Sequence, residues 1–289
     1  MLSVILAGVE TQANTLAALV AHDGWGPAPQ HIISRRGPLQ HGETYEDYRL
    51  DPRHGVLIFK LPLIDLDAMY TARRTLSGVF LPRVRLSLKF AMPYGDRQID
   101  GYALPAEMAW NVEQWAAQKV SYTIYCPDPS FYDPVGIGLT FDLGGGAGAG
   151  VIPMVVPMMV GTSILDAVNT VAYSGDLDSY PDLIRITGPI TNCIITNAAS
   201  GDTFDFTGTT IAAGDYYDID CRYGYKTVVD STGANKIATL TSDSDLATFR
   251  FLAAVDGSGV RNNSISVTGS SVTGATKVEL SFFTRYGGI

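Results

Sequence analysis

The four histidines are the first residues in the sequence that could bind a metal or transfer protons. His22, His31, His41 and His54 all lie in the first half of the chain, and none stands in an HxH or HExxH pattern. His41 and Glu43 are two positions apart, so a strand would place both on one face, where they could share a metal ion. Because the sequence offers no evident third ligand, we interpret the histidines as exposed loop residues and predict no metal site.

Aspartates cluster in the second half at spacings that could suit acid–base catalysis or calcium binding. The groups are Asp176/Asp178, Asp215/Asp218/Asp220 and Asp243/Asp245. A glycosidase needs two carboxylates facing each other across a sugar, whereas Asp218 and Asp220 alternate along one predicted strand and so belong to its solvated face. Asp176 and Asp178 fail the EF-hand pattern, because Tyr180 stands where the next oxygen ligand belongs. We therefore predict no catalytic acid pair and no calcium site.

Three cysteines, Cys126, Cys193 and Cys221, are odd in number and far apart. The sequence has no CxxC pair, which argues against a zinc ribbon and a disulfide framework. Cys193 and Cys221 could bridge if their strands are neighbours, but we favour reduced, buried thiols. A GxSxG nucleophile motif is also missing, and no histidine is near a cysteine in sequence. We predict no catalytic residue.

A glycine-rich run, GGGAGAG at residues 144–150, is the one candidate for binding a dinucleotide. Such a loop must follow a strand and open directly into a helix, whose amide groups and dipole hold the phosphate. Here Val151, Ile152 and Pro153 follow, and Pro153 prevents a productive helix start. The run is therefore predicted to be a linker, and no cofactor is predicted.

Carbohydrate binding is the more serious alternative, because an exposed aromatic face is a common feature of sugar sites. All three tryptophans lie in the first half, so tyrosines would have to serve in the second half. The candidates are Tyr216, Tyr217, Tyr223 and Tyr225. At least one face of this alternating pattern must be core, so the sequence leaves a carbohydrate- or receptor-binding module open as the alternative function.

The composition predicts two β-rich globular domains. The chain has 289 residues, of which 46% are hydrophobic and 17% charged, with 30 glycines and 15 prolines that favour many turns. Its net charge of −9 argues against a nucleic-acid reader, which must neutralise phosphates. The beginning of the sequence lacks a signal-peptide pattern, and the apolar tract at 151–160 contains two prolines and is too short to span a bilayer. We expect a soluble protein that is made in a cytoplasm and does not insert into membranes.

The first half is predicted to contain strands around one helix. Residues 65–78 have a capping aspartate, two arginines near the end and a terminal glycine, with Leu66, Met69, Tyr70, Arg73 and Leu76 on one face. Strict alternation predicts a strand at 83–90 that buries Val84, Leu86, Leu88 and Phe90. A second strand is predicted through Val120, Tyr122, Ile124 and Cys126. Since this half also holds every tryptophan, and Trp and Arg often anchor interfaces, we expect it to carry any assembly contact.

The second half is predicted to be a β-sandwich or jelly roll without a helix. Short strands separated by turn residues are expected at 183–187, 190–196, 203–207, 216–222, 248–252, 264–268 and 277–284. The sequence becomes rich in glycine after Asp133, which places the domain boundary between residues 134 and 150. We therefore predict a first domain at 1–143, a linker at 144–160 and a second domain at 161–289.

Three segments near the domain junction resemble the distal tail proteins (Dit) of long-tailed phages. They are YCPDPSFYD at 125–133, the glycine tract leading into GVIPMVVP at 150–157, and YSGD at 173–176 followed by YPDLIRITG at 180–188. The family typically has Asn-Pro-Gly where this chain has Tyr173-Ser174-Gly175, so that match is partial. The family's late Gly-Asn appears within an insertion at 256–263. The order of the segments carries the resemblance over nearly the whole chain.

The resemblance implies a hexameric ring at the end of the phage tail. In that family the first domain builds the ring, and a galectin-like second domain projects outward. The ring joins the tail tube protein to the baseplate hub, a tail-associated protein, and receptor-binding proteins are a further candidate partner. The family carries no catalytic residues, so none are expected here. An acidic protein also suits a channel that DNA must pass without binding.

Overall fold

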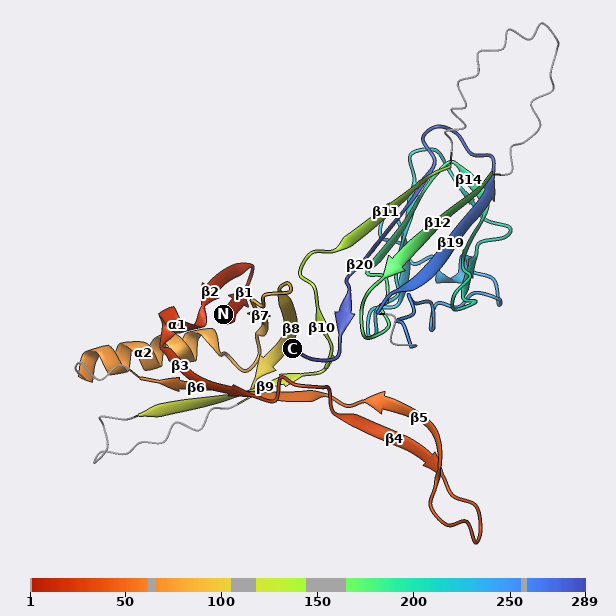
Figure 1. Cartoon of the computed structure of the whole chain (residues 1–289). Helices are drawn as coiled ribbons and strands as arrows, with labels where there is room; N and C mark the ends of the chain where they lie inside the picture. The colour runs from red at the N-terminus through yellow and green to blue at the C-terminus, as the bar shows by residue number, and fades with distance from the viewer. Residues whose placement is uncertain (1, 62–65, 105–117, 144–164, 256–258) are drawn as a thin grey trace, which may run out of the picture. The chain divides into compact units, whose positions relative to one another are not determined.

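The computed structural model describes residues 2–61, 66–104, 118–143, 165–255 and 259–289 (Figure 1). It consists of two compact units. Unit 1 comprises Met1–Pro134 together with Tyr286–Ile289, and unit 2 comprises Val135–Arg285. Within the described ranges, no helix is long and apolar enough to cross a membrane.

The two units divide differently from the sequence-based domains. Strand β11 (Ile137–Asp142) pairs along its whole length with β20 (Lys277–Phe282), so it belongs to unit 2 and not to a first domain ending at 143. The predicted linker at 144–160 lies outside the described residues. The last four residues belong to unit 1. Local sequence patterns could not reveal this return, because it depends on contacts between the two ends of the chain.

Most of the described strands of unit 1 form one hydrogen-bonded sheet with the path β2-β1-β7-β8-β9-β6-β3. Their bounds are β1 Leu2–Leu6, β2 Val9–Gln12, β3 Ala18–Asp23, β6 Arg53–Lys60, β7 Arg85–Phe90, β8 Arg97–Ala103 and β9 Lys119–Cys126. Two short strands extend it, because β10 (Phe131–Tyr132) pairs with β8 and with β21 (Arg285–Tyr286). A four-residue helix, α1 (Ala13–Leu16), lies between β2 and β3. Strands β4 (Gln30–Arg35) and β5 (Thr44–Leu50) form a separate hairpin.

The predicted helix is α2 (Leu66–Val79), one residue beyond the expected terminal Gly78. It packs through Met69, Ala72 and Leu76, which are buried at helical spacing in the core of unit 1. Tyr70 was predicted on this face and is 48% exposed, because Ala72 takes the inward position one turn before Leu76. Each large apolar side chain buried this way stabilises the unit by about 1.5–3 kcal/mol.

Alternation correctly identified the two strands predicted in the first half, except for the first residue of β7. All four inward residues of β9 are buried, as are Leu86, Leu88 and Phe90 of β7. The predicted strand began at residue 83, but β7 begins at Arg85 and Val84 is exposed. The alternation continues into the preceding turn, so the pattern alone could not locate the first hydrogen-bonded residue.

Unit 2 is a β-sandwich, as predicted, and the chain as a whole is mainly β. One sheet has the order β11-β20-β13-β17-β18 and the other has β12-β19-β14-β15, with β16 beside β14. The bounds not yet given are β12 Leu165–Tyr173, β13 Leu183–Thr187, β14 Ile190–Asn197, β15 Thr203–Asp205, β16 Thr210–Ile211, β17 Tyr216–Asp220, β18 Thr227–Asp230, η2 Ile237–Thr239 and β19 Arg261–Ser270. Its core is rich in buried phenylalanines, namely Phe141, Phe204, Phe206, Phe249, Phe251 and Phe282.

Candidate interaction surfaces

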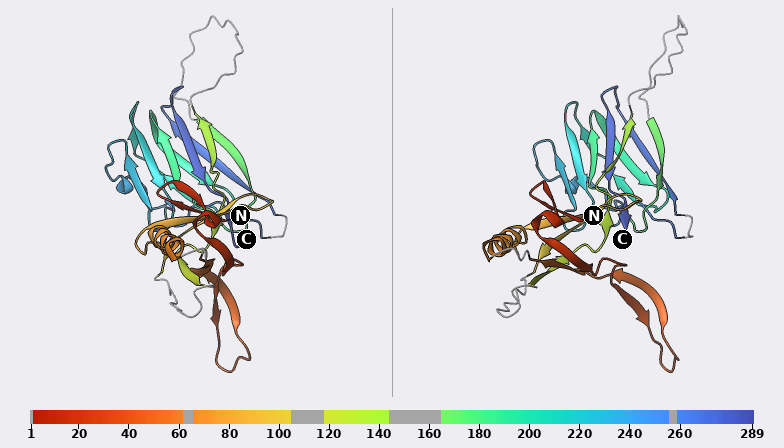
Figure 2. Two further views of the ribbon diagram at one scale, coloured as in Figure 1. Left: turned by 90° about the vertical axis from the view of Figure 1, so that its left-hand side faces the viewer. Right: turned by 60° about the vertical axis from the view of Figure 1, so that its left-hand side comes forward.

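The β4–β5 hairpin is the most exposed part of unit 1, and we call it the arm. Figure 2 shows it extending away from the rest of this unit. Every residue of β4 is exposed, and so is every residue of β5 except Leu50. Among the described residues, the two strands pair only with each other.

The arm carries apolar side chains on both of its faces. Ile32 is 61% exposed and lies directly opposite Tyr48, and the next residue along β4, Ile33, points to the other face. Tyr45 is 61% exposed, and Leu39 in the connecting loop is fully exposed. A lone two-stranded hairpin is marginally stable in water, since it has no third layer to cover its side chains.

A buried arginine anchors the root of the arm. Arg53 opens β6 and is 1% exposed, and its guanidinium donates hydrogen bonds to four backbone carbonyls. Nε bonds Pro129 O at 3.0 Å, Nη1 bonds Gly24 O at 3.1 Å and also Gly26 O, and Nη2 bonds Gly287 O at 2.8 Å. These carbonyls come from three segments far apart in sequence, so one side chain ties them together.

The position of this anchor fixes where the arm leaves the sheet. Gly24 and Gly26 precede the arm and Arg53 follows it, so both ends of the arm are held at one point. The Asp51 N–H donates to Pro29 O at 2.9 Å, which closes the base of the hairpin. The arm therefore starts from a rigid root, although its own strands lie in solvent.

The guanidinium has an aromatic partner, and no carboxylate among the described residues pairs with it. It lies over the Phe131 ring at 4.9 Å from the centroid. Burial lowers the pKa of Arg53, and the neighbouring Cys126 thiol acts in the opposite direction. An arginine side chain remains charged at neutral pH. The four carbonyl dipoles thus take the place of a counter-ion.

Trp25 packs beside this anchor rather than on the surface. It is buried, and its ring contacts Phe90 and Phe131 at centroid distances of 5.3 and 6.4 Å. A Cβ added at Gly55 of β6 would come within 2.1 Å of the indole, so glycine is required for this packing. The expectation that the tryptophans anchor an interface is wrong for Trp25. Residues 110 and 115, the other two, lie outside the described residues.

The histidines are exposed, as predicted, but they are not gathered into a site. His22, His31 and His54 lie on strands and not in loops, since β3, β4 and β6 include them. Glu43 accepts a hydrogen bond from the Ser34 hydroxyl across the arm. In the described part of the chain, no three His, Cys, Asp or Glu side chains are grouped so that they could hold a metal.

Asp218 and Asp220 are engaged by arginines and lie along one strand, β17. Asp218 accepts two hydrogen bonds of 2.7 Å from Arg185 on the neighbouring strand, and Asp220 accepts three of 2.6 to 3.2 Å from Arg222. The prediction that they are simply a solvated face is therefore incomplete, because partly buried ion pairs hold them. Each carboxylate is bound to its own arginine, so the two are not arranged across a sugar as a glycosidase requires.

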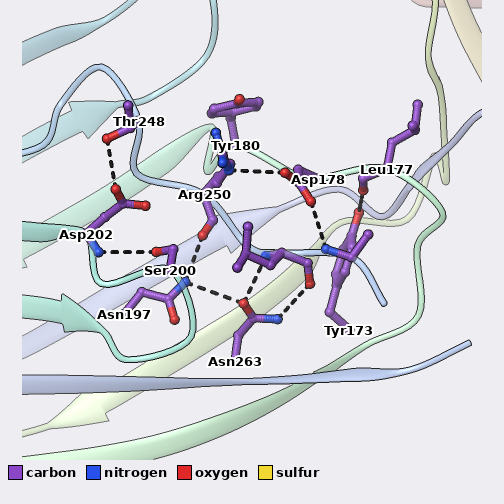
Figure 3. Close-up of polar contacts among 12 residues, drawn as sticks. Tyr173, Leu177, Asp178, Tyr180, Asn197, Ser200, Asp202, Thr248, Arg250 and Asn263 are labelled. Atoms are coloured by element: carbon purple, nitrogen blue, oxygen red, sulfur yellow. Dashed lines mark hydrogen bonds and ion pairs between the residues drawn. The ribbon is translucent and has the colours of Figure 1, made fainter. Parts of the chain in front are cut away.

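Buried side-chain amides form hydrogen bonds to the backbone of residues 250–252, which follow η2 in the chain (Figure 3). Asn263 accepts from the Leu252 N–H at 2.9 Å and donates to Leu252 O at 3.1 Å, and Asn197 donates to Arg250 O at 2.7 Å. Both asparagines are fully buried. The strand predicted at 248–252 is wrong. The segment forms a single β-bridge, between Phe251 and Ser179, and side-chain amides satisfy the backbone groups of Arg250 and Leu252 on either side of it.

The same network continues through the segment at 173–180, part of the sequence used for the family resemblance. Asp178 pairs with Arg250 at 3.1 Å and accepts the Ala253 N–H at 2.8 Å. The Tyr173 hydroxyl donates to Leu177 O at 2.6 Å and is fully enclosed. A Cβ at Gly175 would lie 2.3 Å from that hydroxyl, so glycine is needed in the turn.

The cysteines are free and buried, in agreement with the prediction of reduced thiols. Burial raises the pKa of Cys126 to about 12 and that of Cys193 to about 12, and it raises the pKa of Cys221 further. A reactive cysteine requires a lowered pKa and access to solvent. These thiols therefore fill space in the two cores.

Comparison with known sequences gives no relative, since no protein-family model matches the chain and no curated protein matches it. Comparison with solved structures is informative. The chain is similar to the Dit protein of phage SPP1, described as a paradigm of the hub adsorption apparatus in phages that infect Gram-positive bacteria. The match has a TM-score of 0.65 and 12% sequence identity, and it covers 99% of each chain. The chain has the fold of a distal tail protein.

A second structure is similar over the same extent. A chain of the phage p2 baseplate, in its activated conformation with strontium, matches with a TM-score of 0.51 and 9% identity over 98% of each chain. At these identities the similarity establishes the fold and leaves function to be argued separately. The resemblance inferred from three short segments is confirmed at this level.

Proposed function

We propose that this chain is a structural subunit of the tail tip of a long-tailed phage, where six copies close into a ring. The observation that carries the proposal is the match to a hub protein over 99% of both chains. The match includes both units, so it is not the sharing of one common sandwich. The proposed role is non-enzymatic and located in the virion.

The arm supports assembly through unit 1. Its apolar residues on two exposed faces need a partner, and a second copy of the chain supplies an identical surface at every step of a ring. A stable contact of this kind buries more than about 1,000 Å². The Arg53 anchor gives the arm a fixed direction, which head-to-tail contacts need in order to close rather than to spiral.

The remaining partners follow from this role. The ring would join the tail tube protein to the baseplate hub, with receptor-binding proteins attached further out. A net charge of −9 disfavours DNA binding, which suits a lumen through which DNA passes. Synthesis in the host cytoplasm is part of the same proposal.

The test compares arm variants with a matched control. Ile32→Asp and Tyr48→Asp place charges at one cross-strand pair of the arm and should convert rings to monomers in light scattering. Val168→Asp makes the same change at an exposed residue of β12 in unit 2 and should leave the mass unchanged. Rings that survive both arm substitutions would show that the arm does not make the contact.

A further inference from the structure

The turn between β17 and β18 presents two tyrosines to solvent. Tyr223 is 66% exposed and Tyr225 is 50% exposed. Gly224 between them has a φ of +82°, and the Tyr225 and Lys226 N–H groups both donate to Arg222 O, at 3.1 and 3.2 Å. We call residues 222–226 the tyrosine turn. Its backbone is tightly hydrogen-bonded, although its side chains point outward.

The Tyr223 ring is held by two neighbours. Lys226 Nζ lies over it at 4.8 Å from the centroid, and this ammonium is itself fixed by a 3.2 Å hydrogen bond to Leu246 O. Tyr180 packs against it edge-on at 4.8 Å, with the two hydroxyl oxygens 3.0 Å apart. The ring is therefore held from the protein side, although the residue remains 66% exposed.

The Tyr225 ring is held by a different cation. The Arg222 guanidinium lies over it at 4.6 Å, and Asp220 fixes that guanidinium through contacts of 2.6 to 3.2 Å. Carboxylate, guanidinium and ring thus form a stack at the end of β17. This arrangement places a charged donor and an acceptor next to an exposed aromatic surface.

The turn lies beside the hydrogen-bonded network of unit 2 shown in Figure 3. Tyr180 is separated by one residue from Asp178, which pairs with Arg250 in the amide network of Figure 3. Burial, with Tyr223 as a further cause, raises the pKa of Tyr180 to about 12, so its hydroxyl keeps its proton at neutral pH. A platform fixed in this way loses little conformational entropy when it binds a ligand.

The size and chemistry of this surface decide what it can bind. At their exposed fractions the two rings offer together about 200–300 Å², well below the ~800 Å² per partner of a stable protein interface. Rings of this area match one or two sugar rings, whose apolar faces can lie on tyrosine. Arg222 and Asp220 provide hydrogen-bonding groups at the edge for hydroxyls.

We infer that the tyrosine turn binds a pyranose saccharide through the open surfaces of Tyr223 and Tyr225. This goes beyond ring formation and does not depend on it. Of the four tyrosines considered from sequence, Tyr217 is buried in the core and Tyr216 is partly covered by Arg185. The two that remain exposed both lie in this turn.

The test uses the full chain and defined probes, namely the methyl glycosides of glucose, galactose and N-acetylglucosamine. Saturation-transfer NMR should detect binding of at least one of them, and calorimetry should then show that Tyr223→Ala and Tyr225→Ala each weaken it about tenfold or more. Tyr216→Ala, at the opposite end of β17, is the matched control and should change affinity less than about twofold. Tyr223→Phe should also bind, because it keeps the ring and loses only the hydroxyl contact with Tyr180.

Oligomeric mass and thermal unfolding of each variant separate this inference from the proposed function. Sugar binding lost while mass and melting temperature are unchanged supports the inference alone. If Tyr223→Ala fails to fold, Tyr225→Ala carries the test, since it leaves the Tyr180–Tyr223 pair intact. Absence of binding by the unmodified chain up to about 10 mM glycoside, binding unaffected by both alanine variants, or tyrosine-dependent capture of a purified tail protein without sugar binding would each overturn it.

Discussion

The described residues of each unit include a buried polar centre, and these two centres are built on opposite principles. In unit 1, the charged Arg53 holds four backbone carbonyls from three distant segments. In unit 2, the neutral amides of Asn197 and Asn263 complete the backbone hydrogen bonds of one nearby segment. The first centre links segments near the beginning and the end of the chain. The second supplies hydrogen bonds that a neighbouring strand would otherwise provide to the backbone of residues 250 and 252.

The difference predicts how each unit fails. Loss of the arginine leaves several carbonyls without their donor at once and frees the root of the arm, so its effect should spread through unit 1. Loss of an amide leaves one or two backbone groups unsatisfied, so its effect should remain local to residues 250–252. All three tryptophans lie in the first half, so their fluorescence reports on unit 1 separately from unit 2.

The largest effect is expected for Arg53→Met. This change keeps an apolar stem but removes every donor to the four carbonyls. Because a hydrogen bond from a charged group contributes about 1.5–3 kcal/mol, we expect a total loss of more than about 3 kcal/mol. Denaturant unfolding followed by tryptophan fluorescence should show this loss. Arg53→Lys is the control, because a single ammonium keeps the charge but cannot span all four carbonyls, and an intermediate loss is expected. A methionine variant as stable as the unmodified chain would show that Arg53 is not an anchor.

Deletion of residues 286–289 should destabilise unit 1 and leave unit 2 intact. The deletion removes Gly287 O, which also accepts the Ala28 N–H, and the Ile289 side chain that packs against the core. It also removes the Tyr286 ring that lies 3.4 Å from the Arg97 guanidinium. We expect a loss of about 3 kcal/mol by fluorescence. Tyrosines of unit 2 also contribute to the near-ultraviolet circular dichroism signal. The unfolding transition of unit 2, followed by this signal, should stay at the same denaturant concentration.

Asn263→Leu should cost less, about 2 kcal/mol, and only in unit 2. The leucine cannot pair with Leu252 N–H and C=O, which stay buried without those partners. Fluorescence-detected unfolding of unit 1 should be unchanged in this variant. A shift in that transition would mean that the two centres are coupled, contrary to the comparison.

The smallest effect is a change in thiol labelling that maps each disturbance. Burial raises the pKa of Cys126 and Cys193 to about 12, above the ordinary value near 9, so almost no thiolate forms at pH 8 in the folded chain. Mass spectrometry after iodoacetamide treatment should show little modification of the unmodified chain. Arg53→Met should increase labelling at Cys126, and Asn263→Leu at Cys193. Equal labelling of both thiols in both variants would contradict the prediction that each substitution disturbs only its own unit.

The sequence was sufficient for features that depend on local periodicity. Alternation predicted β7 and β9, helical spacing predicted α2, and the short turn-separated strands predicted the sandwich. It failed where long-range contacts decide. Nothing near Arg53 in sequence indicates that residues 24, 129 and 287 converge on it, and an asparagine at 263 gives no sign that it will satisfy another segment's backbone. The exposed tyrosines were among the candidates, but their exposure required the fold.

The mass and shape of the purified full-length chain test the central proposal most directly. Light scattering should give six times the 31.0 kDa of one chain, and electron micrographs should show closed rings. The arm variants Ile32→Asp and Tyr48→Asp should give single chains under the same conditions. A chain that remains a folded 31.0 kDa monomer at high concentration, with no rings in the micrographs, would contradict the account.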